Sequence, residues 1–230
     1  MQLSSANFWM SSNGGWKAPT VIAPSFTDVK LSAFGVMPDE SMREAQLAAD
    51  DFNTAFEQAC ELQRLVEMKG VKFKMGFANG SSAETGTIKI KHNLFEEVDD
   101  LNRHDAGDAL DEYDAANAGV AEALAALKAQ DRLAFKLNPL PAYGKDEQLI
   151  PSSMYCRKLE NALVEVRFTL THWGIRAGAK DGTSAKDVYN ADIVDMMVLV
   201  PPPPPIASPK KRKVSNLHPS SPTKKHVIKK

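Results

Sequence analysis

The residues best suited to chemistry are cations spaced along segments of alternating hydropathy. Over residues 71–91, apolar side chains alternate with Lys72 and Lys74 and, after an Asn-Gly connection, with Lys89 and Lys91. This period of two predicts a β-hairpin with one apolar face and one lysine face. A single acidic residue opposes the four lysines, so the hairpin carries a local net charge of +3.

A second cationic segment covers residues 157–180, where five basic residues stand against two acidic residues and a tryptophan lies among them. Cationic sheets with exposed aromatic residues bind single strands, because the cations neutralise phosphates and the rings stack on bases. The alternative is that these cations are the ordinary solvent face of a sheet. We predict that the nucleic-acid-binding residues are Lys72, Lys74, Lys89, Lys91, Arg167, Trp173 and Arg176.

Side chains that could support catalysis are not grouped in any familiar motif. The sequence has no Gly-rich dinucleotide or phosphate loop, no zinc-protease motif and no nucleophile-elbow motif. Cys156 and His172 could form a nucleophile–base pair, but a buried structural cysteine is the more ordinary role for Cys156. We assign no catalytic residue, metal site or cofactor, and we expect a non-enzymatic protein.

The cysteines and the apolar runs of the sequence indicate the cellular compartment of the protein. Cys60 and Cys156 lie far apart, which excludes a disulfide framework and a thiolate zinc site and favours a reducing compartment. The first twenty residues do not form a secretory signal, and the apolar run at 193–200 is too short to span a bilayer. We expect an intracellular protein without a membrane partner.

The charges of the chain are divided between an acidic body and a basic end. From Pro209 onward there are eight Lys or Arg and no acidic residue, out of 28 basic and 29 acidic residues in the chain. Residues 1–208 therefore hold 20 basic and 29 acidic residues, a net charge of −9. This asymmetry predicts a folded acidic domain followed by a basic disordered tail at 209–230.

The tail contains a short basic motif that begins at a proline. The motif resembles the nuclear import signal of the simian virus large T antigen, and this resemblance implies a nuclear import adaptor as a partner and nuclear localisation. The proline keeps the residue before it out of the helical region, which suits recognition as an extended strand. The six matching residues are Pro209, Lys210, Lys211, Arg212, Lys213 and Val214.

Two Ser-Pro units flank the basic clusters of the tail, one at Ser208 and one at Ser221. Both resemble the Ser-Pro-x-Lys turns of linker-histone tails, which implies contact with the narrow minor groove of A·T-rich DNA. Both also resemble sites of proline-directed kinases, and a phosphate at Ser208 would add about −1.5 to −2 charges beside the lysines. The sequence leaves both roles open.

A run of five prolines, residues 201–205, separates the body from the tail. Such a run adopts an extended left-handed helix, so we interpret residues 201–208 as a stiff spacer. Proline-binding domains are an alternative partner for the same run.

The strongest helix signal covers residues 41–69. Ser41 and Glu44 fit a capping box, and Gly70 suits the C-terminal cap. An apolar stripe at three- and four-residue spacing, which includes Phe52, Phe56, Ala59 and Val66, predicts the face that packs on the core.

The remaining segments predict a mixture of strands, loops and a second helix. An acidic stretch at 96–114 runs into an alanine-rich helix, for which packing on the body is favoured over a dimerising coiled coil. Alternation predicts strands at 162–175 and 188–200 and one or two strands within 20–36. Residues 1–19 are expected to be partly irregular, and residues 131–157 mostly loop.

These patterns predict an α+β fold with a mostly antiparallel sheet and two long helices in one globular body, residues 1–200. The strands suit either an open sheet or a small OB-like barrel. The preferred function is a non-enzymatic nuclear protein that binds nucleic acid, single-stranded or duplex, through the cationic sheet face. The alternative is a nuclear protein-interaction module that uses the acidic helix and the polyproline run and whose body does not touch nucleic acid.

Overall fold

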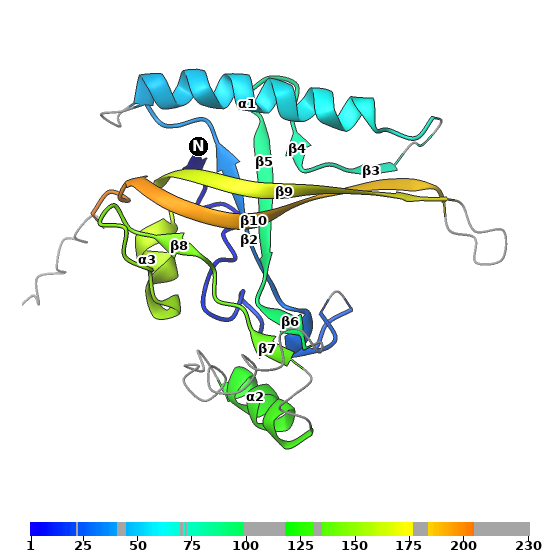
Figure 1. Cartoon of the computed structure of the whole chain (residues 1–230), viewed down its shortest axis with the longest axis vertical. Coiled ribbons are helices and arrows are strands. Elements are labelled where there is room, and N and C mark those ends of the chain that lie inside the picture. The colour runs from blue at the N-terminus through cyan, green and yellow to red at the C-terminus, as the bar shows by residue number, and fades with distance from the viewer. Residues whose placement is uncertain are drawn as a thin grey trace, which may run out of the picture.

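The computed structural model describes residues 1–21, 23–40, 45–69, 71, 73–98, 118–130, 135–176 and 184–204. The fold is α+β with a mostly antiparallel sheet, as the sequence predicted (Figure 1). The helices are α1 (Ala45–Leu65), α2 (Ala118–Gln130) and α3 (Tyr155–Leu159), with 3₁₀ turns η1 (Phe26–Asp28) and η4 (Ser152–Met154). The strands are β1 (Gln2–Leu3), β2 (Lys30–Val36), β3 (Phe73–Met75), β4 (Ala78–Asn79), β5 (Thr87–Asn93), β6 (Phe95–Glu97), β7 (Phe135–Leu137), β8 (Ala142–Tyr143), β9 (Leu163–Ile175) and β10 (Lys186–Val200).

The main sheet has the strand order β3-β10-β9-β1-β2-β5-β4, and β8 also pairs with β10. The pairs β1–β2, β1–β9, β2–β5, β4–β5 and β9–β10 are antiparallel, whereas β3, β5 and β8 each pair with β10 in parallel. The β5–β10 pairing consists of one bridge, between Lys91 and Asp192. Strands β6 and β7 form a separate antiparallel pair.

The longest elements are β9 and β10, which form a ribbon that crosses the molecule (Figure 1). Their antiparallel register runs from Lys186 opposite Ile175 to Val200 opposite Leu163. The sequence predicted both strands, and β10 begins two residues earlier than expected. From Val164 to Trp173, even-numbered residues of β9 face the interior side and odd-numbered residues face outward, which follows from the period of two.

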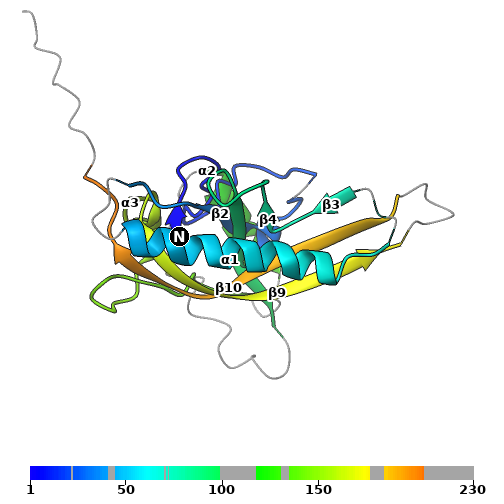
Figure 2. The ribbon, with the colours of Figure 1, turned by 90° about the horizontal axis from the view of Figure 1, so that it is seen from above.

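Helix α1 lies along this ribbon in both the front view and the view from above (Figures 1 and 2). Phe52, Phe56 and Ala59 are buried, so the predicted apolar stripe is confirmed at these positions. The helix ends at Leu65 and not at residue 69, and Val66 is exposed. The predicted caps, at residues 41–44 and 70, lie outside the described residues.

The predicted hairpin over 71–91 is wrong in its pairing. Of the two strands in the first half of this segment, β4 pairs with β5, whereas β3 pairs in parallel with β10. The side chain of Gln63 on α1 explains the break: its Oε1 accepts from the backbone N–H groups of Phe77 (2.7 Å) and Ala78 (3.2 Å). Its Nε2 donates to the carbonyl of Ala78 (2.9 Å). This clamp turns the chain after β3, so the two halves of the predicted strand have different partners.

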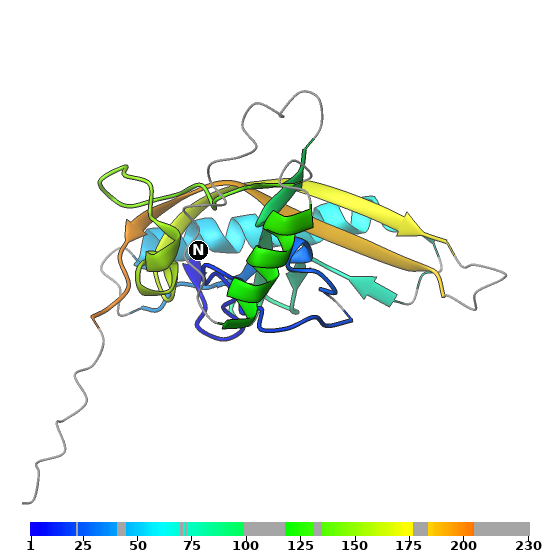
Figure 3. The ribbon, with the colours of Figure 1, turned by 90° about the horizontal axis from the view of Figure 1, so that it is seen from below.

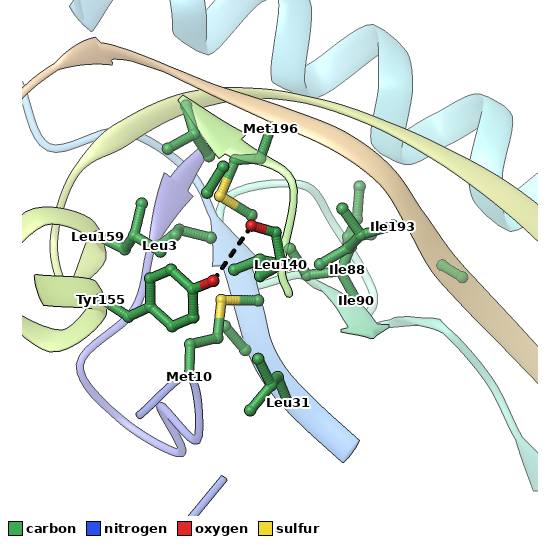
Figure 4. Close-up of a cluster of buried hydrophobic side chains, with 14 of the residues drawn as sticks. Leu3, Met10, Leu31, Ile88, Ile90, Leu140, Tyr155, Leu159, Ile193 and Met196 are labelled. Atoms are coloured by element: carbon green, nitrogen blue, oxygen red, sulfur yellow. Dashed lines mark hydrogen bonds between the residues drawn. The ribbon is translucent and has the colours of Figure 1, made fainter. Parts of the chain in front are cut away.

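The core lies between the sheet, α3 and the N-terminal segment (Figure 4). Leu3, Met10, Leu31 and Ile90 are fully buried there, and the hydroxyl of Tyr155 donates to the carbonyl of Leu140 (3.2 Å). Burial raises the pKa of Tyr155 to about 12, while the hydrogen bond to Leu140 acts in the opposite direction. The phenol is therefore held neutral inside an apolar cluster.

Val120 and Leu124 of α2 are buried, so the helix packs on the body through one apolar face, as the sequence predicted. Figure 3 shows this helix on the near side of the molecule in the view from below. It contacts η1, and the aromatic ring of Phe26 there packs edge-on against Phe95, with ring centroids 5.1 Å apart. In the described parts of the chain, no helix combines the length and the apolar character needed to cross a membrane.

Candidate nucleic-acid interface

A groove of about 730 Å³ runs between the N-terminal segment and strands β2 and β5. We call it the Trp9 groove. One wall is the segment from Trp9 to Ala23, and the other is the outward face of the two strands. Its lining carries one exposed indole and four lysines against one carboxylate: Trp9, Lys17, Lys30, Lys89, Lys91 and Asp28.

Trp9 is held against β2 by its own backbone. Its N–H donates to the carbonyl of Ser32 (2.8 Å), and its carbonyl accepts from the N–H of Ser32 (3.4 Å). Its side chain is nevertheless 50% exposed. The ring lies against Gly15, whose φ is +73° and where a Cβ atom would come within 2.6 Å of the indole. The backbone thus fixes an aromatic surface that remains open to solvent.

Trp16, the second tryptophan at the groove, has a structural role. It is only 9% exposed, and its ring packs on Phe26 with centroids 5.2 Å apart. Asn13 supports the turn before it, because its Nδ2 donates to the carbonyl of Trp16 (2.8 Å). The sequence suggested no difference between the two residues, and tertiary packing separates them.

The lysines of the groove follow from the register of β2 and β5. Ser32 stands opposite Lys91 and Phe34 stands opposite Lys89, so these lysines project from the outward face while Ile88 and Ile90 are buried. The ammonium of Lys89 lies 5.9 Å from the centroid of the Phe34 ring, within cation–π range. The predicted lysine face is therefore present on β5.

Lys91 is the most enclosed of these cations, with 15% of its side chain exposed. Its Nζ lies 3.5 Å from Oδ1 of Asp192 on β10. Burial lowers the pKa of Lys91, the neighbouring charge of Lys30 lowers it further, and Asp192 raises it. Four lysines line the groove against Asp28, and Asp192 pairs with Lys91, so four positive charges stand against two negative charges and the groove favours an anion.

Arg167 lies on β9, outside the groove, and its charge is already matched. Its Nε donates to Oδ1 of Asp195 (2.9 Å), and a second guanidinium nitrogen contacts the other carboxylate oxygen. The hydrogen bond with Asp195 and its negative charge raise the pKa of Arg167. A bidentate pair of this kind leaves less net charge for a phosphate.

Trp173 and Arg176 lie at the distal part of the ribbon. Trp173 is 58% exposed and stands opposite Val188 of β10, whereas Arg176 follows the end of β9 and is exposed. Odd-numbered positions share one face of β9, so Trp173 lies on the same face as Thr169, which stands opposite Asp192. The ribbon therefore presents a second exposed indole on the face that reaches Lys91.

Several predicted site residues are not described by the structure. Lys72 and the tail residues 205–230, including the basic motif at 209–214 and both Ser-Pro units, lie outside the described residues. Lys74 is described only as a backbone position of β3. Of the predicted set, Lys89 and Lys91 come together in the groove, whereas Trp173 lies on β9 and Arg176 directly follows that strand.

Sequence reasoning missed Trp9, Lys17 and Lys30. Trp9 lies in a segment interpreted as irregular, and no periodic pattern links it to β2. Lys30 occupies the first position of β2 and alternates with buried Leu31 and Ala33, so alternation in β2 carried a signal for it. The adjacent glycines, Gly14 and Gly15, marked a turn beside an aromatic residue, a second signal.

Cys156 and His172, the two residues considered as a nucleophile–base pair, have separate surroundings in the structure. Cys156 is exposed on α3, so the expectation that it is buried is wrong, because Tyr155 and Leu159 form the buried face of this short helix. The residue is exposed overall, but partial desolvation of its sulfur, the larger cause, and the charge of Glu160 both raise the pKa of its thiol. Nε2 of His172 lies 2.8 Å from Oδ1 of Asp187. Among the described side chains, no group of three or more acidic, histidine or cysteine residues could hold a metal ion.

The described residues thus combine an exposed indole with clustered ammonium groups in one groove, and they place a second indole on a connected sheet face. This arrangement can stack bases and neutralise phosphates. Comparison with known proteins found no matching family model, no matching curated protein and no matching solved structure.

Proposed function

We propose that this protein binds single-stranded nucleic acid, without catalysis, along the Trp9 groove and the outer face of the ribbon. The observation that carries the proposal is the groove itself, where a half-exposed Trp9 faces Lys30, Lys89 and Lys91. A single strand offers both parts of its ligand at once, because its bases are free to stack and its phosphates are free to pair. A duplex offers only its phosphates to this surface, so the exposed indole favours the single strand.

The proposed path of the bound nucleic acid follows the register of the β-sheet. Lys91 at the end of the groove meets Asp192, and Trp173 lies four residues along β9 from Thr169, the partner of Asp192. Four residues of a β-strand span about 13 Å. A single strand leaving the groove at Lys91 would therefore meet the second indole within a few nucleotides.

The order of strand pairing supports an OB-like arrangement. The pairings β1–β2, β2–β5, β5–β10, β10–β9 and β9–β1 link five strands in a cyclic order, in which β5–β10 is a single parallel bridge. In OB-folds, single strands bind on the face of the second and third strands and between the loops that follow strands one and four. The second and third strands in this order are β2 and β5, and the segment after β1 contains Trp9. This support is an analogy at the level of the fold.

The tail adds two further elements to the proposal. The motif at 209–214 would be read by a nuclear import adaptor and bring the protein to the nucleus, and the eight tail cations would attract nucleic-acid backbones without regard to sequence. Phosphate groups at Ser208 or Ser221 would weaken both effects by opposing the lysines.

The direct test compares full-length wild type with Trp9→Ala, using a labelled oligothymidine and a matched duplex across a salt series. Loss of a stacked base weakens binding to the single strand by about 5-fold to 150-fold, which corresponds to about 1–3 kcal/mol. Duplex binding should change little, because the tail supplies most of it. Leu47→Ala on the exposed face of α1 is the matched control and should leave both affinities unchanged.

Equal losses for single strand and duplex, or no loss at all, would remove the groove from the binding site. The tail alone would then contact nucleic acid, and the body would be better explained as a protein-interaction module. For the import motif, a fusion to a cargo too large to diffuse through nuclear pores is compared with its quadruple variant. Nuclear accumulation that survives the substitutions Lys210→Ala, Lys211→Ala, Arg212→Ala and Lys213→Ala would reject import by this motif.

A further inference from the structure

A second groove, of about 980 Å³, lies between α1 and the loop at residues 80–84. We call it the α1 groove. Its floor includes the buried side chains of Phe56 and Ala83, and the exposed side chain of Leu65 stands at its rim. The groove therefore offers apolar contact as well as polar walls.

The charges on its walls are mostly negative. Glu57 and Glu61 from α1 and Glu84 from the loop line the groove, against Arg64 alone, which leaves a net charge of −2. Among the described residues, none of the three carboxylates forms an ion pair. Glu57 and Glu61 are one helical turn apart, and like charges at this spacing destabilise a helix unless a cation lies between them. The groove is matched to a ligand with cations around an apolar centre.

The chain contains one segment with this character outside the described residues. Residues 224–230 read Lys-Lys-His-Val-Ile-Lys-Lys, with two apolar residues between two pairs of lysines and no acidic residue. The import motif at 209–214 differs, because its one large apolar residue, Val214, stands at its end. The complement to the α1 groove is therefore the last segment of the tail and not the motif.

The length of the tail permits this contact. Residues 205–223 are nineteen residues, which can extend up to about 63 Å. The fifteen residues of β10 span about 50 Å, and α1 runs along the ribbon that β10 forms (Figures 1 and 2). Every part of α1 is thus within reach of a chain that leaves β10 at Pro201.

We propose that residues 224–230 dock in the α1 groove of the same molecule, with Val227 and Ile228 over Phe56 and Leu65 and the lysines beside the glutamates. Tethering makes the contact intramolecular, with an effective concentration on the order of millimolar, so weak individual contacts suffice. Docking withdraws four of the eight tail cations from other partners and leaves the motif at 209–214 on the exposed tether. A polyanion that binds the tail competes with docking.

The test is paramagnetic broadening in the full-length protein. Cys60 and Cys156 are replaced by Ala and Ser, and Ser220→Cys carries a nitroxide label. At low salt, the amide signals of residues 53–65 and 80–84 should broaden, and this broadening should fade at about 0.5 M salt because the carboxylates are screened. Broadening that is absent, or that is spread evenly over the body, would overturn the proposal.

Matched variants separate docking from general attraction. Alanine at the four lysines of 224–230 should abolish the broadening, whereas alanine at the four cations of 210–213 should preserve it. Glu57→Gln with Glu61→Gln should abolish it, whereas Glu122→Gln with Glu165→Gln, at exposed sites elsewhere, should not.

The apolar contact is tested by Val227→Ser with Ile228→Ser, which should reduce the broadening severalfold. Equal effects of the two lysine sets, or no effect of the apolar change, would show a diffuse electrostatic contact and overturn the docking.

Discussion

Lys89→Ala gives the sharpest test of the Trp9 groove, because its effect is read from the salt dependence of binding. A protein that neutralises phosphates of a single strand loses affinity with salt at a slope of about 0.7 per phosphate in the logarithmic plot. The three strand lysines of the groove, Lys30, Lys89 and Lys91, would contribute a slope of at most about 2.1 on this basis. Removing Lys89, which has no acidic partner among the described residues, should reduce the slope by about 0.7.

This change has a measurable size. Between 50 and 200 mM salt, a difference of about 0.7 in slope means that the variant loses about 2.6-fold less affinity than the wild type. The eight tail cations are present in both proteins, so their larger contribution cancels in the comparison. The assay is fluorescence anisotropy of a labelled oligothymidine at five salt concentrations. Lys158→Ala, at an exposed site on α3, is the matched control.

Lys91 and Asp192 make the prediction specific to this structure. Since Asp192 lies 3.5 Å from the ammonium of Lys91, Lys91→Ala should reduce the slope by less than Lys89→Ala does. Asp192→Asn should have the opposite effect, with tighter binding at low salt and a steeper slope. Equal slopes for Lys89→Ala and Lys158→Ala, or weaker binding by Asp192→Asn, would refute the assignment of phosphates to this groove.

Three further predictions concern the framework that holds these surfaces. Asp187→Ala should lower the free energy of unfolding by about 3 kcal/mol in urea titrations, because the fully buried carboxylate of Asp187 is hydrogen-bonded to the His172 ring and to the backbone N–H of Met68. Burial raises the folded-state pKa of the Tyr155 phenol to about 12, above its usual value of 10.0. The free energy of unfolding should therefore not depend on Tyr155 below pH 10 and should fall as pH rises toward 12. Tyr155→Phe should remove this part of the alkaline loss of stability in pH-dependent melts. Gly15→Ala should displace the indole of Trp9, shift the tryptophan emission and weaken single-strand binding severalfold while duplex binding is retained; an unchanged emission spectrum would contradict the described packing.

The sequence determined the elements whose periodicity is long and regular. In β9, the alternation that predicted an interior face and an exterior face is present from Val164 to Trp173. In α1, the spacing of Phe52, Phe56 and Ala59 identified the buried stripe. These patterns are readable because burial acts on one face of an element, and the face repeats with the geometry of the backbone.

Strand partners were not determined by the same patterns. Alternation in 71–79 is equally compatible with pairing to β5 or to β10, since a period of two specifies a face and not a neighbour. The choice was made by Gln63, fourteen residues before Phe77, which holds the turn after β3 against α1. A contact between elements decided what local sequence could not.

The candidate site divides in the same way. The sequence placed Lys89, Lys91 and Trp173 on the outward faces of their strands, because charge and alternation are local properties. Only the structure shows that Lys91 is largely enclosed there. Only the tertiary structure brought Trp9 beside β2 and set Asp195 against Arg167. Grooves and ion pairs form between segments that are distant in the sequence, so no repeating spacing in the sequence links their residues. The charge and hydropathy of each residue are local properties of this chain, whereas the proposed binding surface depends on contacts that form only when distant segments pack together.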